Sequence, residues 1–77
     1  MTSEEWRHIF GDNLASILDE QGMTQNELAR KIGISPSRVN DYIHGHSAPS
    51  VYAAINMAYV LDVDIGEFID FDEPIEI

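Results

Sequence analysis

Residues 23–45 read MTQNELARKIGISPSRVNDYIHG and contain the start signals of two short helices. Thr24 and Glu27 have the spacing of a capping box, in which each side chain accepts a hydrogen bond from the other residue's backbone N–H. Ser35 is a favoured N-cap, and Pro36 suits the first helical position because its missing N–H costs nothing there. Two helices in close succession are therefore expected.

The turn between these two helices is too short for them to pack antiparallel, so they should cross steeply. Gly33 can adopt the positive φ that the turn needs, and Ala29 is small enough for the helices to approach closely. Ile34 and Val39 can fill the corner from inside. The spacing therefore predicts a helix-turn-helix over residues 24–44.

Capping signals and apolar spacing predict three further helical segments. They open at Thr2-x-x-Glu5, at Ser50 and at Asp64-x-x-Glu67, the last being a single turn. The expected inward positions of the first segment are Trp6, Ile9, Phe10, Leu14, Ile17 and Leu18, and those of the fourth helix are Val51, Ala54, Ile55, Ala58 and Leu61, whereas the last segment carries Ile65, Phe68 and Ile69. No window alternates with strand periodicity. The predicted fold class is all-α, a compact five-helix domain over residues 1–70 with an acidic tail over 71–77.

Length and composition exclude several classes of protein. With 77 residues the chain has room for one core. No apolar run is long enough for a membrane span or a signal peptide. The absence of cysteine removes disulfides, thiolate nucleophiles and most structural zinc sites, and fits a cytoplasmic protein.

The net charge of −10 opposes nucleic-acid binding, because Lys and Arg supply the affinity for phosphates and the chain has four of them. The charge is unevenly spread. Residues 22–47 hold three cations against two carboxylates, a balance of +1, which leaves −11 for the rest. The acidity therefore lies outside the helix-turn-helix segment, where His44 and His46 can add positive charge below neutral pH.

The sequence resembles the phage repressor and Cro (XRE-like) family of helix-turn-helix regulators. The resemblance rests on residues 23–35, Val39 and residues 45–50, and it extends over 51–61 and 63–68, within a matching region of about 6–69. It implies a lambda-repressor-like fold whose second motif helix enters the major groove. The function implied is a sequence-specific, repressor-like transcriptional regulator from a phage or a bacterium, acting on a double-stranded DNA operator.

The resemblance also implies DNA-contacting residues. Pro36, Ser37 and Arg38 would face base edges, and Gln25 resembles a family glutamine that touches phosphate and braces the recognition helix. The remaining candidates are Ser35, whose helix end offers amide donors, Asn40 and Asp41 as lesser base contacts, His44 in the place of a phosphate-contacting asparagine, and His46 on a loop that approaches the backbone. Pro36 and Asp41 depart from the family pattern, so specificity would rest on Arg38 and Ser37.

A homodimer is expected, because one recognition helix covers few base pairs. Its proposed surface is the last helix and the tail, with Ile65, Phe68, Ile69, Phe71 and Ile75. No catalytic site, cofactor or small-molecule substrate is expected. A metal site at His44 and His46 is disfavoured, because a third ligand with known spacing is missing.

Two alternatives stay open. The first is a protein-interaction module of the same fold, antitoxin-like or antirepressor-like, in which the net charge of −10 has weakened or abolished DNA binding. The second is a fragment of a longer repressor whose sensory domain is missing, which is compatible with the DNA-binding reading.

Overall fold

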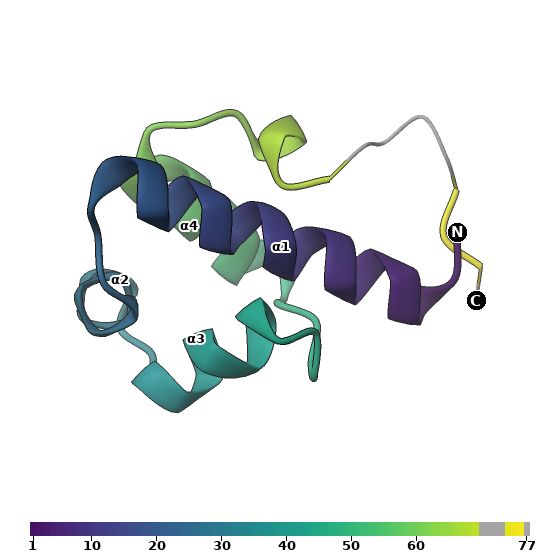
Figure 1. Cartoon of the computed structure of the whole chain (residues 1–77), viewed down its shortest axis with the longest axis horizontal. Helices are drawn as coiled ribbons and strands as arrows, with labels where there is room; N and C mark the ends of the chain where they lie inside the picture. Colours follow the sequence, from purple (N-terminus) through teal and green to yellow (C-terminus); the bar gives the residue numbers. More distant parts are fainter. Residues whose placement is uncertain (70–73, 77) are drawn as a thin grey trace.

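Four α-helices and one 3-10 turn form the part of the chain that the computed structural model describes, residues 1–69 and 74–76 (Figure 1). They are α1 (Ser3–Gln21), α2 (Gln25–Ile32), α3 (Pro36–Ile43), α4 (Val51–Leu61) and η1 (Ile65–Glu67). These residues include no strand, and the predicted all-α class is confirmed. The expected fifth helix is a three-residue 3-10 turn, because only one turn separates the left-handed Asp62 from the buried Phe68.

Side-chain caps start the helices where the sequence predicts them. A hydroxyl at each N-cap accepts a hydrogen bond from the backbone N–H three residues on, over 3.1–3.3 Å, at Thr2, Thr24, Ser35 and Ser50. Glu5 and Glu27 accept the return bonds of the two capping boxes. Gly22 and Gly33 end α1 and α2 in the left-handed conformation.

The helices enclose one core. In Figure 1, α1 runs the length of the molecule, α3 lies below it, α4 behind it, and α2 closes one end. Trp6 stacks on Phe10 with ring centroids 5.4 Å apart, and Phe10 stacks on Phe68 at 5.0 Å. The other buried core residues are Leu14, Ile17, Leu18, Leu28, Ala29, Val39, Tyr42, Ala54, Met57, Ala58 and Leu61.

Three positions expected inside lie on the surface. Ile9 is 37% exposed, Val51 70% and Ile55 51%. On α4 each residue turns about 100° from the last, so the side that buries Ala54 and Met57 cannot also bury Ile55. Met57, which the spacing argument passed over, takes the core position instead.

The expected dimer surface at the end of the chain is wrong for two of its residues. Phe68 is 0% and Ile69 3% exposed, because both side chains complete the core. Phe71 lies outside the described residues, whereas Ile75 is exposed and Ile65 lies at the edge of exposure. Within residues 1–69 and 74–76, the hydrophobic side chains that leave the largest fractions exposed belong to α4.

Gly11 lets α1 and α3 approach closely. It is buried, and a Cβ atom there would collide with the carbonyl oxygens of Tyr42 and Ile43 near the end of α3. A side chain at this position would therefore push α3 away from α1. None of the helices in residues 1–69 and 74–76 has both the length and the hydropathy needed to cross a membrane.

Candidate nucleic-acid interface

The corner between α2 and α3 has the predicted construction. Gly33 has a φ of 77°, and the N–H groups of Gly33 and Ile34 both donate to the Ala29 carbonyl, at 2.9 and 3.0 Å. Ala29 and Val39 are fully buried, and Ile34 packs against the core from the side. The two helices therefore form one rigid unit that presents the start of α3 to solvent.

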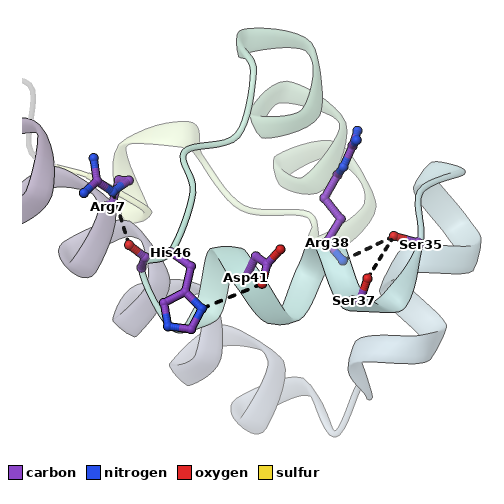
Figure 2. A network of polar contacts seen from close by, with 7 residues as sticks. Arg7, Ser35, Ser37, Arg38, Asp41 and His46 are labelled. Carbon is purple, nitrogen blue, oxygen red and sulfur yellow. Dashed lines mark hydrogen bonds and ion pairs between the residues drawn. The ribbon is translucent and has the colours of Figure 1, made fainter.

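The first turn of α3 is open to solvent. Ser35, Pro36, Ser37 and Arg38 are all exposed. The Ser35 hydroxyl accepts from the Arg38 backbone N–H at 3.3 Å and lies 3.5 Å from the Ser37 hydroxyl (Figure 2). No hydrogen bond or ion pair within the described residues engages the Arg38 guanidinium. This turn therefore presents a cation that has no partner among the described residues, next to two exposed serine side chains.

Asp41 does not neutralise Arg38. Its Oδ1 lies 3.7 Å from Nδ1 of His46 on the following loop, and both side chains are more than half exposed (Figure 2). Asn40 is half-buried one position earlier on the helix, and its carbonyl accepts from the His44 N–H. Of the candidate residues of α3 and of the loop, Asp41 and His46 are thus brought into contact.

A groove of about 610 Å³ lies beside Arg38 and Asp41, between α3 and the start of α4. Tyr52 and Asn56 of α4 line its far wall. Neither residue was predicted as part of the site, because no capping or spacing signal distinguishes them within an apolar helix. Tyr52 is 81% exposed, so its hydroxyl is accessible beside the recognition turn.

The loop after α3 is held from α1. Arg7 Nε donates to the Gly45 carbonyl at 3.2 Å, and a Cβ atom on Gly45 would overlap the His8 ring. The rings of His44 and His46 lie 5.8 Å apart. Arg7 is therefore engaged in holding the loop, whereas the side chains of Arg30, Lys31 and Arg38 are all exposed.

Gln25 occupies the first position of α2 and is half-buried. Its side chain makes no hydrogen bond to α3 in the described part of the chain, so its bracing role stays a prediction. Among residues 1–69 and 74–76, no three His, Cys, Asp or Glu side chains are grouped as they would be around a metal ion.

Several solved structures are similar to this chain. The controller protein C.AhdI of restriction and modification in Aeromonas hydrophila is 25% identical, with a TM-score of 0.78 over 82% of this chain and 96% of its own. The SOS-response transcriptional repressor LexA from Eubacterium rectale is 26% identical, with a TM-score of 0.80 over 95% of this chain and 79% of its own. The clp gene regulator ClgR from Corynebacterium glutamicum, at 22% identity, shares the fold with a TM-score of 0.79 over 82% of this chain and 67% of its own.

A search of curated protein sequences finds no match to this chain. The sequence profile of the helix-turn-helix family HTH_3 matches residues 14–68, which include α2, α3, α4 and most of the core. The chain therefore belongs to the HTH_3 helix-turn-helix family.

Proposed function

We propose that this protein is a sequence-specific, repressor-like transcriptional regulator that binds double-stranded DNA with the first turn of α3 in the major groove. The observation that carries the proposal is the exposed turn from Ser35 to Arg38, whose guanidinium has no partner in the described residues. The similarity to a controller protein and to a transcriptional repressor, each at 25% identity or more, supports it.

The chemistry of the turn assigns a role to each side chain. Arg38 pairs with O6 and N7 of guanine, a contact worth about 1–3 kcal/mol of discrimination. Ser37 donates to or accepts from a neighbouring base, and the Pro36 ring packs against a thymine methyl group. Backbone N–H groups at the starts of α2 and α3 bind phosphate, which offsets the shortage of cations.

The proposed assembly on DNA is a homodimer. One α3 reaches only a few base pairs, and a second copy related by two-fold symmetry reads a second half-site about 34 Å away. The operator is therefore expected to be an inverted repeat.

Selection of bound sequences from a random DNA library at low salt tests the proposal. The natural protein should enrich an inverted repeat with a fixed guanine in each half, and Arg38→Ala should lose the preference at that base pair alone. Arg30→Ala, which removes an exposed cation from the end of α2, should keep the motif. A library that stays random with the natural protein would refute sequence-specific binding.

A protein-interaction module is the second candidate, favoured by the net charge of −10. The salt dependence of DNA affinity separates the two. A dimer that places Arg30 and Lys31 of each subunit on phosphates, with Arg38 on a base, should show a log–log slope of about −4 above 0.1 M salt. An affinity that does not change with salt would favour the protein partner.

A further inference from the structure

The outward side of α4 is apolar and open to solvent. Val51 is 70% exposed, Tyr52 81%, Ile55 51% and Tyr59 86%, and we name these four residues the α4 face. The helix contains eleven residues and none of them is charged, whereas the chain as a whole carries −10. The opposite side of α4 is already buried in the core through Ala54, Met57, Ala58 and Leu61.

The α4 face has the form of an interface. Val51, Ile55 and Tyr59 are four residues apart, so they make one ridge with Ile55 at its centre, and such ridges are the units of helix packing. Grouped exposed apolar side chains on a small domain mark a surface that another molecule covers. Tyrosine is also a residue type enriched in protein interfaces.

We infer that the α4 face is the surface through which two copies of this chain associate. Two molecules of charge −10 repel one another, and this repulsion is weakest where a surface carries no carboxylate, as on α4. A cationic partner would instead be recruited by the carboxylates elsewhere on the chain. A second copy is therefore the occupant that fits an uncharged face on an acidic protein.

Helix geometry sets the register of the pair. If two α4 helices pack antiparallel about a two-fold axis at Ile55, Tyr59 of each copy lies opposite Val51 of the other. Beside Val51 is a cavity of about 170 Å³ whose walls include Pro49, Ile65 and Ile69, an apolar site for an aromatic ring. The same register brings Asp62, after the end of α4, toward the positive end of the partner's α4 dipole.

The area available indicates a weak dimer. An aromatic side chain buries about 150–250 Å², so two largely exposed tyrosines with Val51 and Ile55 contribute roughly 500 Å² per subunit. A standard interface buries about 800 Å² per partner. The dimer should therefore form at micromolar or higher protein concentration and be favoured by adjacent half-sites on DNA.

This inference rests on the proposed function, because it names the surface through which the proposed homodimer forms. Self-association through α4 does not require DNA, so it can be tested in the absence of DNA. Sedimentation equilibrium up to several hundred micromolar should show a monomer–dimer equilibrium for the natural chain. Ile55→Asp should be monomeric throughout, whereas Ile9→Asp, which places the same charge on an exposed apolar position of α1, should dimerise like the natural chain. Circular dichroism checks that both variants are folded.

A disulfide tests the register, because the chain contains no cysteine. Ile55→Cys should oxidise to a covalent dimer, since a residue on the two-fold axis meets its own copy at disulfide distance. Ile9→Cys should stay largely monomeric under the same conditions. Covalent dimer at equal rates in both variants would overturn the inference, as would a natural chain that remains monomeric or an Ile55→Asp variant that still dimerises.

The outcomes also separate this inference from the proposed function. A natural chain that dimerises through Ile55 but enriches no DNA motif would support the α4 interface and refute the proposed function as a regulator. If the natural chain enriches a motif but Ile55→Asp does not change its self-association, the proposed function is supported and the α4 interface is refuted.

Discussion

Gly11 determines where α3 sits on α1, and its replacement by alanine is our first prediction. Alanine is favoured over glycine inside a helix by about 1 kcal/mol, but here its Cβ would meet backbone oxygens of α3 that cannot turn aside. We expect Gly11→Ala to lower the free energy of unfolding by about 1–3 kcal/mol, measured by urea denaturation.

Gly66→Ala is the matched control for this experiment. A Cβ at Gly66 would meet nothing within 4 Å, and its φ is not in the left-handed region. Its stability should change by no more than about 0.5 kcal/mol. A Gly11→Ala protein as stable as the natural chain would show that α1 and α3 can separate without loss.

Arg38 and Gln25 should affect DNA binding in different ways. Arg38→Ala should weaken binding to the selected operator by about 1–3 kcal/mol and leave binding to an operator with the guanine replaced almost unchanged. Gln25→Ala should weaken both DNAs alike, because a phosphate contact carries no sequence information. Fluorescence anisotropy on the two operators measures both effects.

Asn26→Ala, at the exposed position next to Gln25, serves as the control and should bind as the natural chain does. If Gln25→Ala lowered affinity for one operator only, Gln25 would be a base contact and its predicted role would be wrong.

The roles of some residues could be predicted from the sequence, whereas the roles of others could not. The N-cap role of Ser35 is local, because its hydroxyl bonds an N–H three residues away, and it could be predicted. The roles of Gly11 and Arg7 depend on segments more than thirty residues distant, Tyr42 and Gly45, and no local pattern encodes such a contact. Tyr52 and Asn56 were also missed, because the start of α4 lies across a groove from Arg38 and Asp41 and no local pattern encodes that placement.

At the scale of the element, the capping box of α1 makes stability depend on pH. Hydrogen bonds from the backbone N–H and then the side chain of Thr2 lower the pKa of Glu5 below its usual 4.5. Since the folded-state pKa is the lower one, the charged carboxylate stabilises the fold above pH 4.5, and this contribution is lost as the pH falls through the folded-state pKa.

Glu5→Gln should therefore lower the melting temperature at pH 7 and have a smaller effect at a pH below the folded-state pKa of Glu5, where both proteins are uncharged at this position. Glu4→Gln removes the same charge from the same turn but not the hydrogen bonds from Thr2, so it should show the smaller change at pH 7. Equal losses in the two variants would mean that the charge, and not the capping box, is what stabilises α1.

The starts of the four α-helices were predictable, whereas the buried sides of two of them were predicted only in part. Caps act within one turn, so their signals survive in the sequence. On α4 apolar residues surround the helix, and spacing alone cannot tell the side that meets the core from the side that meets solvent. The burial of Phe68 depends on stacking against Phe10 across the molecule, which is why an exposed dimer surface was expected there.

For the whole molecule, the unequal distribution of charge governs the approach to DNA. Residues 22–47 carry a balance of +1 and the remainder −11. The longest dimension is 32 Å. At 0.01 M salt the Debye length is about 30 Å, so carboxylates anywhere on the protein repel the phosphates, whereas at 0.15 M it is about 8 Å and only groups near the interface act.

The size of the protein relative to the Debye length determines how its DNA affinity depends on salt. Counterion release favours binding less as the salt concentration rises, so the affinity for DNA falls. Screening of the distant carboxylates raises the affinity over the same range, and this screening effect is largest at low salt. The log–log plot of affinity against salt should therefore be nearly flat from 0.01 to 0.1 M and steepen to a slope of about −4 above that range. Arg30→Ala should reduce the steep slope by about 2, because each dimer loses two phosphate contacts. A single constant slope across the whole range would show that the acidic remainder of the chain has no influence on DNA binding.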